Sequence, residues 1–156
     1  MFQCRFCLND KPLSNFEILD EKDALLFPAF SGQGSHVNKR LDACLKDGGP
    51  IPPGRYYIVD RQSGGRLEWL YNLFSDHSIW FALYADDGEV DDKTLCEKIV
   101  RGSFRLHPRG PRGISEGCIT IQDLSDFHRL RLKLKSKPPT PIQGRALSAY
   151  GIVAVV

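Results

Sequence analysis

No stretch of the chain is apolar enough to cross a membrane. The longest apolar run is the tail from Tyr150 to Val156, whereas a transmembrane helix needs about 20 apolar residues. The N-terminus has one early basic residue, Arg5, and turns polar at Asn9, without the apolar core or small-residue cleavage site of a secretory signal peptide. We therefore expect a protein without a membrane span that is synthesised in the cytoplasm, so that any export would use another route.

The chain has no large excess of charge of either sign. Its 21 Lys and Arg residues against 19 Asp and Glu residues give a net charge of +2, which does not indicate a nucleic-acid partner. The distribution is uneven, because residues 101–146 carry +7 and the rest of the chain −5. Such a field would attract anionic substrates. A solvated helix face next to an Arg-bearing loop explains the same pattern without a ligand.

Cysteine occurs five times, and an odd number in a chain without a leader does not describe a disulfide framework. Cys4 and Cys7 form a CxxC motif, but no second pair follows at zinc-ribbon spacing, and residues three apart on a strand point to opposite faces. The glycine-rich segments lack the Lys and Ser/Thr of a phosphate loop, and the acidic run 86–92 does not fit an EF-hand. We therefore expect no metal and no cofactor.

Length and composition predict one mainly β domain, a β-rich α+β fold over residues 1–156. A chain of this size buries about 70% of its extended surface, and 42% apolar with 26% charged residues is ordinary for a globular protein. Short apolar runs between Gly, Pro and Asn-Asp turns predict strands near 2–8, 13–19, 25–30, 55–60, 79–84 and 148–156. Apolar spacing predicts two or three short helices, at 67–74, at 95–100 with Asp92 as N-cap, and at 123–134 with Asp123 or Ser125 as N-cap.

The segment 104–121 carries the strongest chemical signal. A strand delivers His107, a Gly/Pro/Arg loop reverses the chain, and a small-residue turn delivers Cys118 at the start of another apolar run. A thiol acts as a nucleophile when a neighbouring imidazole takes its proton. The pattern therefore favours Cys118 as nucleophile and His107 as base, although a buried cysteine and an ordinary histidine fit the spacing as well.

Neighbouring residues have candidate roles in the same chemistry. The backbone N–H groups of Gly117 and Cys118 are placed to face a developing oxyanion. Arg105 lies two residues before His107 on a strand, shares its face and is suited to holding a carboxylate. Ser115 either orients the histidine or the substrate, or is an ordinary turn hydroxyl.

The order His107 followed by Ser115-Glu116-Gly117-Cys118 resembles the active-site signature of L,D-transpeptidases, whose catalytic domain is a YkuD-type β-sandwich. Together with the segments 30–32 and 49–62, this signature resembles the L,D-transpeptidase-related effectors of the bacterial type VI secretion system. The signature motifs run from about 27 to 121, and the likeness continues to the C-terminus; it does not cover the first 26 residues.

The resemblance implies an antibacterial toxin that acts in the periplasm of a rival bacterium on the tetrapeptide stems of peptidoglycan. The enzyme would attack the bond between the third residue, a diamino acid, and the terminal D-Ala, with Cys118 as nucleophile. The acyl-enzyme would pass to water, an L,D-carboxypeptidase reaction, or to a free D-amino acid, an exchange reaction. The implied partners are the type VI secretion machinery and a cognate immunity protein in the producing cell.

The chain departs from ordinary L,D-transpeptidases in ways that bear on substrate binding. The loop between His107 and Cys118 is short, and Thr120 stands where the family usually has Arg or Asn. Candidate residues for binding the stem carboxylates are therefore other arginines, namely Arg61, Arg105, Arg109 and Arg112.

Three alternatives remain open from the residues. A papain-like amidase also uses Cys and His, but its Cys normally precedes its His. A muramidase would use two carboxylates, for which Glu68 and Glu89 are candidates. A non-catalytic module would bind anions through the basic segment 101–146.

Overall fold

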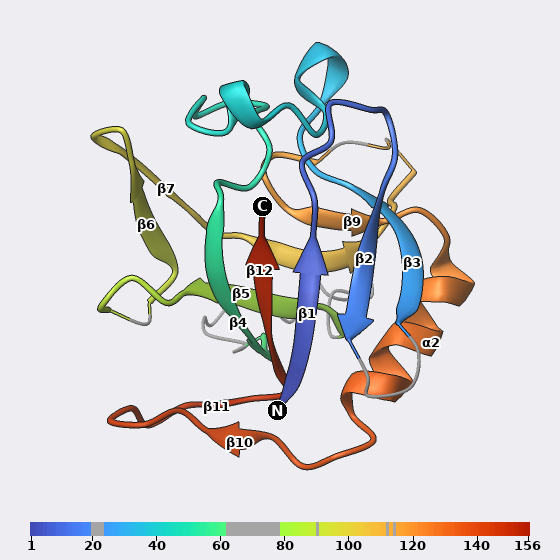
Figure 1. Ribbon diagram of the computed structural model, residues 1–156, viewed down its shortest axis with the longest axis vertical. Helices are drawn as coiled ribbons and strands as arrows, with labels where there is room; N and C mark the ends of the chain where they lie inside the picture. Colours follow the sequence, from blue (N-terminus) through green and yellow to red (C-terminus); the bar gives the residue numbers. More distant parts are fainter. Residues whose placement is uncertain (20–23, 62–78, 90, 112, 114) are drawn as a thin grey trace.

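Eight strands close into a single barrel in the order β1-β12-β4-β5-β8-β9-β3-β2 (Figure 1). The computed structural model describes residues 1–19, 24–61, 79–89, 91–111, 113 and 115–156. The barrel strands are β1 (Phe2–Phe6), β2 (Ser14–Leu19), β3 (Leu25–Phe30), β4 (Gly54–Asp60), β5 (Phe81–Ala85), β8 (Arg105–Pro108), β9 (Ile119–Ile121) and β12 (Gly151–Val155). The predicted β-rich fold is therefore confirmed.

Alternation of apolar and polar residues explains how the strands fill this barrel. In β1 the side chains of Phe2, Cys4 and Phe6 are buried while the residues between them are exposed. The same alternation places Cys4 in the core and leaves Cys7, just beyond the strand, exposed. The CxxC motif therefore has its two thiols in different environments, as the strand spacing predicts.

The C-terminal tail lies between β1 and β4. Strand β12 pairs in parallel with β1 and antiparallel with β4. The predicted strand 148–156 is interrupted at Tyr150, and its first residues form β11 (Ser148–Ala149), which pairs with β10 (Thr140–Pro141) in a separate two-stranded sheet. Near the other end of the barrel lie two short 3₁₀ helices, η1 (Gly34–His36) and η2 (Arg40–Asp42).

Helix α2 (Leu124–Leu134) begins after Asp123, as the spacing predicts, and packs beside β3, β8 and β9. Its buried residues, Phe127, Leu130 and Leu134, repeat at helical spacing and join the core of the barrel. No helix in the described part of the chain is long and apolar enough to span a membrane.

The predicted helix at 95–100 is wrong, because this segment forms a β-hairpin. Strand β6 (Lys93–Cys96) pairs with β7 (Ile99–Gly102), and the connecting Glu97 and Lys98 both have positive φ, which a helix does not allow. Leu95 is 68% exposed, so the apolar spacing that suggests a helix does not mark a buried face. Asp92 caps no helix and instead contacts Arg105. The predicted helix at 67–74 lies outside the described residues.

Candidate functional site

Strands β8 and β9 bring the predicted nucleophile and base to one face of the sheet. They pair in parallel with Leu106 opposite Ile119 and His107 opposite Thr120. Leu106 and Ile119 are fully buried in the barrel core. Because successive side chains on a strand point to opposite faces, His107 and Thr120 face away from that core. Cys118 directly precedes Ile119 and shares this outward face, so the register places it diagonally from His107.

The His107 ring has a defined tautomer in its neutral form. Its Nδ1 lies 2.8 Å from the carbonyl oxygen of Pro108, which can only accept, so Nδ1 carries the hydrogen. The other nitrogen, Nε2, then carries the lone pair and lies 3.4 Å from the Thr120 hydroxyl oxygen. The basic nitrogen is thus directed toward β9, the strand that Cys118 directly precedes.

Aromatic stacking covers the outer face of this histidine. The Trp80 ring stacks on His107 with centroids 4.4 Å apart and an interplanar angle of 22°. The Arg61 guanidinium in turn lies 5.9 Å from the Trp80 ring centre. His107 is therefore buried in a fixed orientation, and one of the four predicted arginines reaches it through the tryptophan.

The Cys118 thiol opens into a cavity of about 290 Å³, whose walls come from residues 46–47, from residues 100–103 and from Glu116. Its sulfur lies 3.9 Å from the Ser103 carbonyl oxygen. Burial raises the pKa of this thiol to about 11, although the backbone N–H and positive charge of Arg105 act in the opposite direction. At neutral pH the resting thiol is therefore protonated, and catalysis by it requires a base.

The turn before Cys118 depends on two small residues. Ser115 is buried, and its hydroxyl donates a 2.7 Å hydrogen bond to the Cys118 carbonyl oxygen. Gly117 has a φ of +94°, and a Cβ there would lie 2.5 Å from Arg101 Nη2 and 3.0 Å from the Phe104 ring. Ser115 thus holds the Cys118 backbone, and only glycine fits at position 117.

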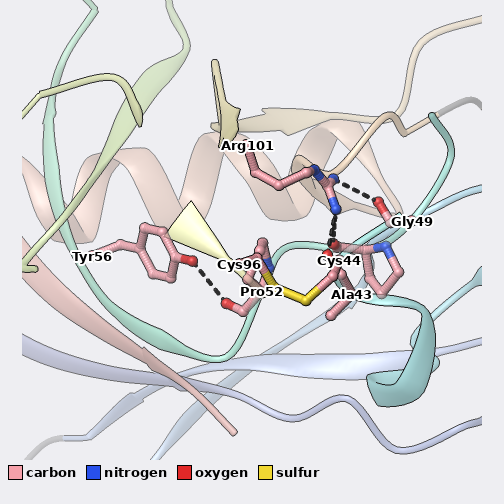
Figure 2. Close-up of a disulfide and its surroundings, with 8 residues drawn as sticks. Ala43, Cys44, Gly49, Pro52, Tyr56, Cys96 and Arg101 are labelled. Carbon is pink, nitrogen blue, oxygen red and sulfur yellow. Dashed lines mark hydrogen bonds between the residues drawn. A yellow bond between two sulfur atoms is a disulfide. The ribbon is translucent and has the colours of Figure 1, made fainter. Parts of the chain in front are cut away.

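Arg101, on β7, is a buried residue of this site that the sequence analysis did not identify. Its guanidinium donates to the carbonyl oxygens of Ala43, Gly49 and Pro50. It also lies over the Phe104 ring, 5.5 Å from its centre. Figure 2 shows it reaching from the hairpin into the loop that precedes β4. Burial lowers the pKa of Arg101, but an arginine remains charged at any physiological pH.

A disulfide between Cys44 and Cys96 joins the same loop to β6, across 52 positions of sequence (Figure 2). The loop contributes Lys46 and Asp47 to the thiol cavity, and the hairpin contributes residues 100–103. The disulfide and the Arg101 hydrogen bonds therefore tie together two walls of the cavity that holds Cys118. The odd number of cysteines in the sequence does not reveal this pair.

Arg105 binds the carboxylate of Asp92, a residue of the protein itself. Its two Nη atoms each lie 2.7 Å from an oxygen of Asp92. Arg109 is exposed at the rim of a second cavity, whereas Arg112 lies outside the described residues. Of the two carboxylates suggested for a muramidase, Glu89 is exposed and Glu68 is outside the described residues.

The family comparison matches most of the chain. A family model described as the Tlde1 domain matches residues 26–144, which include β8, β9, the disulfide and all of the site residues above. Neither the curated proteins nor the solved structures that were compared yield a match.

Proposed function

The chain belongs to the Tlde1 domain family of type VI secretion effectors, and we propose that it cleaves peptidoglycan tetrapeptide stems through a thioester on Cys118. Such effectors are antibacterial and are delivered by the secretion machinery into target cells. The proposed site of action is the periplasm, where the stems are exposed. An immunity protein would protect the producing cell.

The observation that supports this proposal is the register of β8 and β9, in which His107 pairs with Thr120 and Cys118 directly precedes the first residue of β9. Alternation of side chains along a strand puts Cys118 on the same face as Thr120 and His107. The preceding turn supplies a glycine with positive φ, so the backbone N–H groups of Gly117 and Cys118 are unobstructed by a side chain at 117. A nucleophile, a base and backbone donors at one turn are the parts that acyl transfer requires.

In the first half of the reaction His107 Nε2 takes the proton of the Cys118 thiol. The sulfur then attacks the carbonyl carbon between the third residue and the terminal D-Ala, and the N–H groups of Gly117 and Cys118 stabilise the oxyanion. When the tetrahedral intermediate collapses, the C–N bond breaks and the imidazolium returns its proton to the amine of D-Ala. The product is a thioester on Cys118.

In the second half an incoming nucleophile releases the acyl group. Water, deprotonated by His107, gives a tripeptide, whereas the amine of a free D-amino acid gives a stem with a new terminal residue. The cysteine recovers its proton from the imidazolium. Both outcomes remove the original D-Ala from the stem.

The test is mass spectrometry of disaccharide-tetrapeptide incubated with the purified protein, with and without a free D-amino acid. We expect loss or replacement of the terminal D-Ala with the wild-type protein and with Cys7→Ala, which removes an exposed free thiol. Cys118→Ala should abolish both products. Cleavage that persists in Cys118→Ala would exclude the thioester mechanism, and intact tetrapeptide with all three proteins would exclude this substrate.

A further inference from the structure

A second, larger cavity opens beside the C-terminal ends of β8 and β9 and beside Phe30 of β3. Its volume is about 510 Å³, and its lining includes Phe30, Arg109 and Gln122 together with Lys11 and Lys39. None of the steps of acyl transfer described above uses these residues. The cavity that holds Cys118 is smaller, at about 290 Å³.

The strand ladder places this cavity in line with the catalytic pair. The Arg109 N–H donates to the Ile121 carbonyl at 2.9 Å and the Gln122 N–H to the Pro28 carbonyl at 2.8 Å, so the ladder continues past the ends of β8 and β9. Arg109 therefore follows His107 by one pleat, about 7 Å along the strand, on the same outward face.

The neighbouring strands agree with this alignment. Gln122 directly follows β9, two residues after Thr120, and Phe30 on β3 is paired directly with Thr120. His107, Thr120 and Phe30 thus form a row across three strands, with the larger cavity beginning beside it. Cys118 lies at the opposite end of the same face, so the two cavities flank the catalytic pair.

The lining of the larger cavity combines basic and apolar side chains, which suits an anionic ligand with an apolar part. Lys11, Lys39 and Arg109 contribute three positive charges, against one negative charge from Asp10. Phe30 and Leu13 provide apolar surface between them. A ligand that fits combines several carboxylates with an aliphatic backbone, as an acidic peptide does.

We propose that this cavity binds the free carboxylates of the stem residues that precede the scissile bond, with Lys11, Lys39 and Arg109 as the binding residues. The proposal rests on the proposed function and names the part of the substrate that each cavity accepts. The acyl side of the stem is the larger fragment and occupies the larger cavity, while the departing D-Ala fits the small cavity at Cys118.

The test uses direct binding, so that it does not depend on turnover. Isothermal titration of the Cys118→Ala protein would compare a disaccharide-tetrapeptide with the same molecule carrying amides in place of the stem carboxylates other than that of D-Ala. We expect Lys39→Glu and Arg109→Glu each to weaken binding of the acidic stem about tenfold or more, and to have little effect on the amidated stem. Lys98→Glu, at the exposed tip of the β6–β7 hairpin, is the matched control and should leave both affinities unchanged.

Equal affinity for the acidic and amidated stems, or equal losses in Lys98→Glu, would overturn the subsite. Carboxylate-dependent binding that is lost in Arg109→Glu would support it even if the wild-type protein released no D-Ala, and in that case only the proposed function would fail. Where turnover is measurable, we expect Lys39→Glu and Arg109→Glu to raise KM more than they lower kcat. An unchanged KM would contradict it.

Discussion

The guanidinium of Arg101 lies against the α-carbon of Gly117, so closely that a Cβ at residue 117 would come within 2.5 Å of Arg101 Nη2. Arg101 in turn donates to three carbonyl oxygens of the loop 43–50. The turn that presents Cys118 therefore rests on a buried cation, which is itself held by a loop from a distant part of the sequence. Changes in this loop should therefore alter the position of Cys118.

Gly117→Ala should abolish activity while leaving most of the fold intact. The new methyl group would meet Arg101 and Phe104 at a φ of +94°, so both steric overlap and backbone strain act on the turn. We expect a loss of about 1–3 kcal/mol in the free energy of unfolding and at least about a hundredfold loss of D-Ala release, measured by urea unfolding and mass spectrometry. Gly88→Ala is the control, because Gly88 has a φ of +105° and nothing within 4 Å of its Cβ position. An equal loss of D-Ala release in Gly88→Ala would show that the overlap with Arg101 is not the cause.

Reduction of the Cys44–Cys96 disulfide should destabilise the protein and weaken its activity. A cross-link across 52 positions removes unfolded-state entropy worth about 4 kcal/mol in the chain-entropy treatment, and it also ties two walls of the thiol cavity together. We expect dithiothreitol or Cys44→Ser to lower the urea midpoint and to slow D-Ala release.

The matched control for the disulfide is Cys7→Ser, which removes an exposed thiol that forms no disulfide. Its urea midpoint and its response to dithiothreitol should equal those of the wild-type protein. A cytoplasm keeps such thiols reduced and a periplasm oxidises them, so the stable form of the protein is expected in the periplasm, which we propose as its site of action. Identical unfolding curves with and without dithiothreitol would contradict this expectation.

Alkylation of Cys118 should increase steeply with pH. Burial raises the pKa of the thiol to about 11, so the reactive thiolate fraction grows about tenfold per pH unit from pH 7 to 10. The measurement is the iodoacetamide reaction rate, with the modified residue located by peptide mass spectrometry. A rate that is already constant above pH 6 would reveal a preformed thiolate–imidazolium pair and exclude a protonated resting thiol.

The same raised pKa predicts how stability changes at high pH. The folded-state pKa of Cys118, about 11, lies above the ordinary thiol pKa of 9.0, so the folded state holds the proton more tightly than the unfolded chain. The resulting stabilisation is complete below pH 9 and is lost as the pH rises from about 9 to 11. Between pH 9 and 11, Cys118→Ala should therefore lose less folding stability than the wild-type protein. The buried Cys4, whose pKa is raised to about 12, is present in both proteins and contributes equally to their loss of stability.

Thr120→Val should lower kcat about tenfold with little change in KM. The hydroxyl lies 3.4 Å from His107 Nε2 and is fully buried beside it. Valine keeps the volume of the side chain but removes the hydroxyl that contacts this nitrogen. Thr120→Ser keeps the hydroxyl and should retain most of the activity. Wild-type kinetics in Thr120→Val would show that the contact has no role in orienting the base.

Local patterns in the sequence predicted most of the secondary structure. Strand β3 has the expected bounds, and α2 begins and ends where capping residues and apolar spacing place it. The error at 95–100 has a local cause, because the spacing of Leu95 and Ile99 fits a helix while the turn at Glu97 and Lys98 adopts positive φ. Because these turn positions hold Glu97 and Lys98 and no glycine, the sequence lacks the glycine by which such a hairpin turn is usually recognised.

The candidate site likewise contains some residues that the sequence selects and others that it does not. The order of His107, Gly117 and Cys118 along the chain was sufficient to select them, and the family match covers this segment, while their catalytic roles stay predictions. The sequence shows Arg101 only as part of a basic stretch and Thr120 only as a departure from the family pattern. Their importance depends on which groups surround them.

The sequence by itself determined the local elements and the candidate nucleophile and base, because backbone propensities and short motifs act over a few residues. Only the tertiary structure decided that Cys44 meets Cys96, that Arg101 lies under Gly117 and that Arg105 is occupied by Asp92. Each of these contacts joins separate segments. The closed barrel and its strand register, which bury one side of β8 and β9, determine which distant groups meet on the other side.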